Sequence, residues 1–167
     1  METATRTQVA IIGGGPAGLL LSHILQRNGN DSIVLERQSR THVMARIRAG
    51  VLEAGTVALL REVGLDARMD REGHPHDGSA IAWEGRSRFF IDARKFTGKA
   101  MMAYGQTAIT EDLYSAREAA GGQVIDEADN VRLHELTSGR PYVTTRKKDR
   151  ASGSTVITSP DATVIMA

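Results

Sequence analysis

Three glycines with the spacing of a dinucleotide-binding turn are the most informative residues of this chain. Gly13, Gly15 and Gly18 satisfy the pattern G-x-G-x-x-G between an apolar run and an apolar helical stretch. The first glycine of such a turn permits the tight bend, the second lets a pyrophosphate approach the backbone, and the third lets the helix pack against the strand. N–H groups at the start of the helix favour the negative charge of a phosphate. The turn therefore predicts a site for the phosphates of a dinucleotide.

A carboxylate at the end of the next apolar run completes this pattern. Residues 32–35 have the composition of a second buried strand, and Glu36 follows them directly. A carboxylate at that position can accept hydrogen bonds from both ribose hydroxyls of a nucleotide. The alternative is a glycine-rich turn that binds nothing. Nucleotide binding is favoured because strand, helix and acidic residue accompany the glycines together.

The elements that must position these residues form one strand–turn–helix–strand unit. Residues 7–12 are a short β-branched run, residues 17–27 are helical in pattern and end at Asn28 and Gly29, and residues 32–35 follow as the second strand. Parallel strands joined by a crossover helix predict an α/β, Rossmann-like fold.

The rest of the chain predicts short elements and a small β-rich excursion near residues 79–104. The polar, basic segment 37–48 is too charged for a core element, and segment 66–78 is loop-like. His74, His76 and Asp77 are metal-ligand types, but with no further ligand cluster they favour an exposed turn and no metal site. The expected elements are a helix at 52–63, a hairpin of 79–83 with 88–91, a helix from Thr107 or Thr110 to Ala120, and strands at 124–125, 131–134 and 142–145.

Composition limits the function classes. The net charge is +1, so we expect no strong attraction to nucleic acid or to an anionic membrane. The chain has no cysteine, which excludes disulfides and thiolate chemistry. No stretch approaches the ~18–20 apolar residues that cross a bilayer. These features predict a soluble, cytoplasmic protein.

Several segments closely resemble the flavin-dependent aromatic hydroxylases. The most specific is Arg-Ile-Arg-Ala-Gly-Val-Leu-Glu at residues 46–53, typical of members that act on 4-hydroxybenzoate. The resemblance covers about residues 6–148. It implies a Rossmann-like FAD-binding region in an enzyme where NADPH or NADH reduces FAD and O₂ is used to convert 4-hydroxybenzoate to 3,4-dihydroxybenzoate. It is compatible with a homodimer for the full-length form. Further matching segments are 35–38, 59–64, 104–107, 116–119, 131–134 and 140–144.

The resemblance also implies roles for individual residues. His42 stands where relatives often carry tyrosine, which leaves the choice between NADPH and NADH open. Without the resemblance, Arg46 and Arg48 would be interpreted as a solvated loop face. The implied roles are Gly13, Gly15 and Gly18 at the FAD pyrophosphate, Glu36 at the adenosine ribose, Arg46 and Arg48 beside the diphosphate, Gln106 at the ribityl chain, and Arg37, Gln38 and His42 at the nicotinamide coenzyme.

The family pattern is present only in its N-terminal part. The second flavin motif and the substrate domain are missing, so no residue of this chain is nominated as catalytic. Residues 1–150 are therefore expected to be the N-terminal part of an FAD- and NAD(P)H-binding domain, inactive by itself. Two alternatives stay open: a truncated remnant that binds nucleotide weakly, and an NAD-binding dehydrogenase domain, which would leave segments 46–53 and 104–107 unexplained.

The composition changes near residue 150. Residues 151–167 carry a single charge, Asp161, and no convincing periodicity, so we expect neither a strand nor a domain there. Codons that begin one base earlier across residues 156–167 can spell Cys-Asp-Tyr-Ile-Ala-Gly-Cys-Asp-Gly-Tyr-His-Gly, the strand and Asp-Gly motif that the family carries at this point. The tail is thus predicted to be an out-of-frame translation, with a divergent in-frame tail as the alternative.

Overall fold

The computed structural model describes residues 3–46, 50–137, 140–147, 154–158 and 163–167. It divides into two compact units. One consists of Met1–Arg46 with Thr110–Ala167, and the other of Ile47–Ile109. Among the residues described, no helix is both long and apolar enough to cross a membrane.

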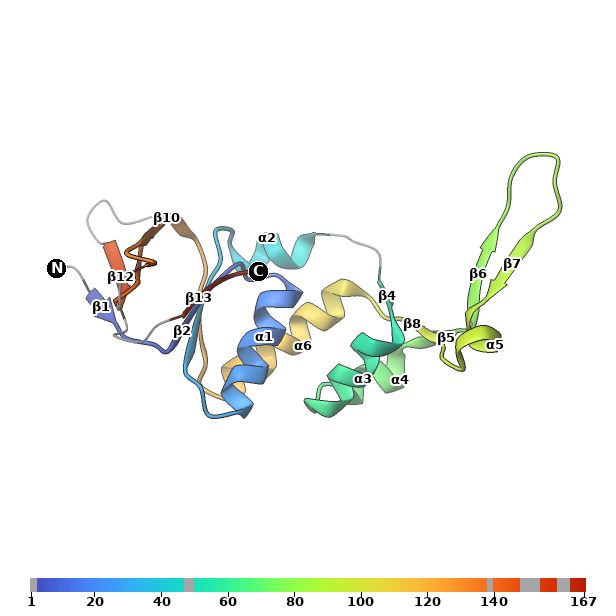
Figure 1. Cartoon of the computed structure of the whole chain (residues 1–167), viewed down its shortest axis with the longest axis horizontal. Coiled ribbons are helices and arrows are strands. Elements are labelled where there is room, and N and C mark those ends of the chain that lie inside the picture. The colour runs from blue at the N-terminus through green and yellow to red at the C-terminus, as the bar shows by residue number, and fades with distance from the viewer. Residues whose placement is uncertain (1–2, 47–49, 138–139, 148–153, 159–162) are drawn as a thin grey trace. The chain divides into compact units, whose positions relative to one another are not determined.

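A four-stranded parallel sheet forms the centre of the first unit. Its order is β13 (Thr163–Met166), β2 (Val9–Ile12), β3 (Ser32–Leu35), β9 (Gln123–Ile125). All four residues of β3 are buried, as expected for a strand covered on both faces. Helix α1 (Pro16–Arg27) connects β2 to β3 (Figure 1). The α/β, Rossmann-like prediction is therefore confirmed.

A second sheet shares the core of this unit. Its order is β1 (Thr3–Thr5), β12 (Ser154–Thr158), β11 (Tyr142–Lys147), β10 (Ala128–His134). Ala10, Ile33 and Leu35 of the parallel sheet form one buried cluster with Ala128 and Val143 of the second sheet. The two sheets are therefore held together by apolar contacts, the main favourable contribution to folding.

The expectation that residues 151–167 form no strand is wrong. β13 pairs in parallel with β2 along its whole length, from Thr163 opposite Val9 to Met166 opposite Ile12. Half-buried Val164 packs against the core cluster. Thr, Val and Ile suit a half-buried pleated surface, and the edge of β2 supplies the backbone partners. Four residues are too few for their own periodicity to reveal this strand.

The second unit is built from short elements. It contains α3 (Ala54–Glu62), α4 (Ala67–Glu72), α5 (Ala93–Thr97) and a three-stranded antiparallel sheet in the order β4 (Val51–Leu52), β8 (Met101–Ala103), β5 (His74–His76). The predicted hairpin is confirmed as β6 (Gly78–Ile81) and β7 (Phe89–Asp92). Helix α6 (Gln106–Ala119) begins in this unit and continues into the first.

Two segments expected to be irregular contain regular structure. Segment 66–78 includes α4 and β5, because the fully buried Met69 anchors α4 and β8 supplies backbone partners for β5. Segment 37–48 includes α2 (Arg40–Ala45), where the Ser39 side chain accepts a hydrogen bond from the backbone N–H of His42 at 3.2 Å. In both segments the abundance of charged residues obscured the short helix.

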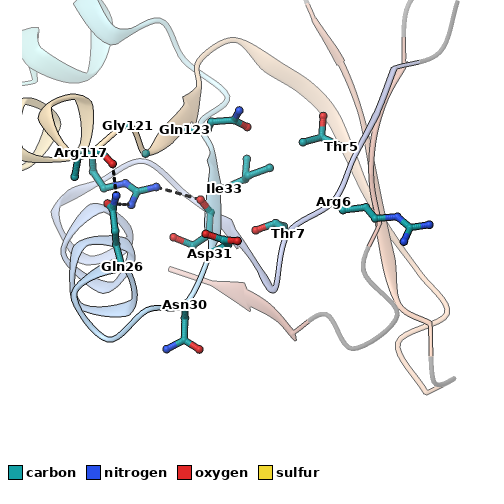
Figure 2. Close-up of a pocket in the computed structure, with 13 residues that line it drawn as sticks. Thr5, Arg6, Thr7, Gln26, Asn30, Asp31, Ile33, Arg117, Gly121 and Gln123 are labelled. Atoms are coloured by element: carbon teal, nitrogen blue, oxygen red, sulfur yellow. Dashed lines mark hydrogen bonds between the residues drawn. The ribbon is translucent and has the colours of Figure 1, made fainter.

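A buried arginine joins α1, β3 and α6. Arg117 is 1% exposed and donates to the carbonyl oxygens of Ser22 at 3.4 Å and Ser32 at 3.1 Å, and to the side-chain oxygen of Gln26. Burial lowers the pKa of this guanidinium. A Cβ on Gly122 would overlap it. Figure 2 shows the guanidinium pointing toward Gln26 beside a polar cavity of about 260 Å³.

Replacing this arginine should destabilise the first unit. Arg117→Met keeps an unbranched side chain but leaves the Ser22 and Ser32 carbonyls without their side-chain donor. We expect the free energy of unfolding, measured by urea denaturation, to fall by about 1–3 kcal/mol. Arg61→Met is the control, because Arg61 forms an exposed ion pair with Asp70. Equal stability of the two variants would contradict the role of Arg117.

Candidate functional site

The glycine turn follows β2 and is shaped by two close backbone approaches. Gly13 has φ 121°, a left-handed conformation that favours glycine. A Cβ on Gly13 would overlap the carbonyl oxygen of Ala167, and a Cβ on Gly18 would overlap the carbonyl oxygen of Gly13. The first turn of α1 can therefore lie directly against the end of β2.

Gly15 differs from these two glycines because no packing constraint requires it. It is the N-cap residue of α1, with an extended φ of −74°, and a Cβ there would meet no atom within 4 Å. The first N–H groups of a helix lack intrahelical partners and can bind anions. The space at Gly15 thus fits a phosphate group that approaches the backbone.

The Glu36 carboxylate lies against the same turn. One oxygen accepts the backbone N–H of Gly14 at 2.7 Å, and the other accepts that of Gln38 at 2.7 Å. A Cβ on Gly14 would lie 2.7 Å from the Cβ of Glu36, so the approach requires glycine. Each carboxylate oxygen has two lone pairs, which leaves capacity for hydroxyl donors.

A cavity of about 630 Å³ opens at the carboxyl ends of β2 and β3. Ligands of α/β proteins bind at this edge of the sheet. Gly15 and Gly18 are not among the described residues that line the cavity. The sequence-predicted residues that line it are Gly13, Glu36, Arg37, Gln38, His42 and Arg46, together with Ile12, Leu35, Ala128, Asp129, Asn130, Val131 and Ala167.

Two predicted cofactor residues are not brought into this cavity. Arg48 lies outside the described residues. Gln106 is the first residue of α6 and belongs to the second unit. The roles of both therefore stay predictions.

Sequence reasoning missed Gly14 and the beginning of β10. The register of β10 shifts between Asp129 and Arg132, and Asn130 has φ 53°. Asp and Asn are poor strand formers, so the strand was expected only from Val131 onward. The tolerance of asparagine for the left-handed region was the one local signal of this bulge. For Gly14, the signal was the run of three consecutive glycines.

A polar cluster ties α2 to α6 beside the cavity. Arg40 forms an ion pair with Glu118, and its guanidinium lies 4.5 Å from the centre of the Tyr114 ring. The Tyr114 hydroxyl donates to Asp126 at 3.1 Å. Burial raises the pKa of both Tyr114 and Asp126. These contacts position the helix that carries His42.

The raised pKa of Asp126 predicts a pH-dependent stability. The folded state holds this proton more tightly than the unfolded state, so the free energy of unfolding falls as pH rises through the folded pKa. Asp126→Asn cannot ionise, yet its side-chain oxygen can still accept from Tyr114. We expect it to raise the melting temperature at about pH 7.5, with a difference that shrinks toward about pH 3.5. A variant less stable than wild type at the higher pH would contradict this.

Known proteins with similar sequences share this region. The sequence profile of the FAD binding domain family matches residues 6–159. The p-hydroxybenzoate hydroxylase of Acinetobacter baylyi is 42% identical over 140 residues, which are 83% of this chain and 34% of that protein. The 6-methylpretetramide 4-monooxygenase of Streptomyces rimosus is 38% identical over 93 residues, 55% of this chain and 22% of that protein. The chain thus spans about a third or less of these relatives.

Solved structures show the same fold. The p-nitrophenol 4-monooxygenase PnpA of Pseudomonas putida superposes with a TM-score of 0.81 at 18% identity, covering 100% of this chain and 41% of that one. At this identity the likeness concerns the fold alone, whereas the family match rests on sequence. This chain belongs to the FAD-binding domain family of the flavin-dependent aromatic monooxygenases.

Proposed function

We propose that the first unit binds the adenosine–pyrophosphate half of FAD at the carboxyl ends of β2 and β3. The observation that carries this proposal is the open backbone at Gly15, next to a turn that the Glu36 carboxylate holds through Gly14. Glu36 would accept hydrogen bonds from the ribose hydroxyls. The residues assigned to FAD are Gly13, Gly15, Gly18, Glu36, Arg46, Arg48 and Gln106.

The nicotinamide coenzyme is assigned to neighbouring residues. Arg37, Gln38 and His42 line the same cavity as Glu36. Their cationic and amide groups suit phosphate oxygens, to which arginine can donate two parallel hydrogen bonds. NADPH or NADH would bind beside this segment and reduce the flavin. The fixed position of α2 against α6 keeps the segment in place for that interaction.

The whole enzyme is proposed to hydroxylate 4-hydroxybenzoate to 3,4-dihydroxybenzoate. The 42% identity to a p-hydroxybenzoate hydroxylase and the motif at residues 46–53 support this substrate. When bound, FAD supplies the redox chemistry that transfers an oxygen atom from O₂ to the aromatic ring. The residues of this chain bind and orient FAD. A cytoplasmic location and a homodimeric full-length form belong to the same proposal.

A nucleotide-binding protein without turnover is the second candidate function. The observation that favours it is coverage, because the chain spans 34% of its p-hydroxybenzoate hydroxylase relative. Residues 1–150 would then bind nucleotide, and the segment after residue 150 would be the product of a shifted reading frame. An NAD-dependent dehydrogenase domain is less well supported, since the sequence match is to monooxygenases.

The FAD proposal predicts a selective effect at Gly15. Gly15→Ala adds a methyl group into open space, so folding should persist while the methyl group blocks the phosphate. We expect the Kd for FAD and for ADP, measured by calorimetric titration, to rise at least about tenfold, or ~1.4 kcal/mol. Gly55→Ala is the matched control, because its Cβ would also meet no atom within 4 Å and it lies in the second unit. Equal affinities for both variants would refute the site.

The enzyme proposal is tested by restoring the other reading frame. Nucleotide sequencing through codons 145–167 and beyond identifies the shift, and the protein translated in the restored frame is then assayed. We expect NADPH oxidation that depends on 4-hydroxybenzoate and yields 3,4-dihydroxybenzoate, and no turnover from the 167-residue chain. A restored protein that binds FAD and ignores 4-hydroxybenzoate would disprove the substrate. Turnover by the 167-residue chain would disprove its inactivity.

A further inference from the structure

The phenylalanines and the tryptophan of this chain are exposed, and they lie in one short segment. Trp83 is 48% exposed, Phe89 60%, Phe90 52% and Phe96 77%. The sequence contains three phenylalanines and one tryptophan, so this segment holds all of them. Aromatic side chains normally dominate cores and interfaces. Apolar patches of this kind on a protein surface mark interaction sites.

The hairpin register places three large apolar side chains on one face. Ile81 lies opposite Phe89, and Ser79 lies opposite Ile91. Directly opposite residues share a face, as do residues two apart along a strand. Ile81, Phe89 and Ile91 therefore form a continuous surface, here named the apolar hairpin face. The three side chains are 47%, 60% and 44% exposed.

The hairpin is a two-stranded sheet of its own. β6 pairs with β7, and Figure 1 shows the two strands extending as a ribbon beyond β5 and α5. Its attachment to α5 includes an ion pair between Arg94 and Asp77 at 3.1 Å and a hydrogen bond from the Arg94 N–H to the Asp77 carbonyl. A two-stranded sheet is marginally stable in water without a packing partner. The hairpin therefore requires a covering surface.

We propose that the apolar hairpin face docks the polypeptide that corresponds to the part of the relatives outside the matched region. This part makes up about two-thirds of the p-hydroxybenzoate hydroxylase relative, of which this chain covers 34%. The inference rests on family membership and is independent of the proposed substrate. The partner is thus a folded segment with an apolar patch, supplied either on the same chain or as a separate one.

Charge around the face favours this partner over a second copy of the chain. The exposed cations Arg86, Arg88, Arg94 and Lys95 surround it, and Arg86 and Lys95 lie over the Trp83 and Phe96 rings at 5.9 Å. In a twofold dimer the same patch meets itself, so these cations would face one another. Juxtaposed like charges oppose association. A partner with an acidic rim fits the surface better.

Co-purification tests the proposal. The tagged 167-residue chain is co-expressed with the untagged polypeptide of the Acinetobacter baylyi relative that lies beyond the match. We expect recovery in a 1:1 ratio, and at least a tenfold loss of recovery with the double variant Phe89→Ser, Ile91→Ser. Leu136→Ser is the control, because Leu136 is 55% exposed and lies outside the hairpin. Its recovery should equal that of the wild-type chain.

A covalent fusion provides the second measurement. Residues 1–147 are joined to the same polypeptide, and amide hydrogen exchange of residues 78–92 is compared with that of the 167-residue chain. We expect at least tenfold slower exchange in the fusion. Unchanged exchange in a fusion that melts cooperatively would overturn the proposal. So would self-association of the chain alone that the double variant abolishes. FAD titration of the same samples reports separately on the proposed cofactor site.

Discussion

The approach of the glycine turn to the end of β3 is the contact on which the nucleotide-binding edge depends. Ile12 pairs with Leu35, so both strands finish at the same edge of the sheet. The next residues then meet, because the Gly14 N–H donates to the Glu36 carboxylate at 2.7 Å. A hydrogen bond to a charged acceptor contributes about 1.5–3 kcal/mol. The cavity beyond β2 and β3 keeps its shape because this bond joins its two walls.

Helix α1 is held at both of its ends. At its first turn, Gly18 lies against the carbonyl of Gly13. At its last turn, the Gln26 side chain meets Arg117 and donates to the carbonyl of Ala120. A helix fixed in this way presents its N-terminal N–H groups in one orientation before a ligand arrives. Preorganisation of this kind lowers the cost of binding. The buried arginine, at the opposite edge of the sheet, thereby contributes to phosphate binding without touching it.

Sequence reasoning succeeded where a pattern is local and long. The unit from β2 to Glu36 was predicted because glycine spacing, helical periodicity and a buried strand each carry their own signal. Helix α6 and the β6–β7 hairpin were found for the same reason. It failed where a short element depends on a distant partner. Helix α4 requires the burial of Met69, β5 requires β8, and β13 requires the edge of β2. The contribution of Gly14 depends on a side chain 22 residues away.

Strand β13 separates what the fold requires from what the site requires. A parallel edge strand is selected by backbone hydrogen bonds and by a few half-buried apolar side chains, here Val164 and Ile165. Any β-branched run of this length satisfies those conditions, including one translated in a shifted frame. The end of this strand, however, lies beside Gly13, where Ala167 lines the cavity. An alanine offers no carboxylate there, whereas the Asp-Gly segment of the other frame would. The fold thus tolerates the tail that the site chemistry does not.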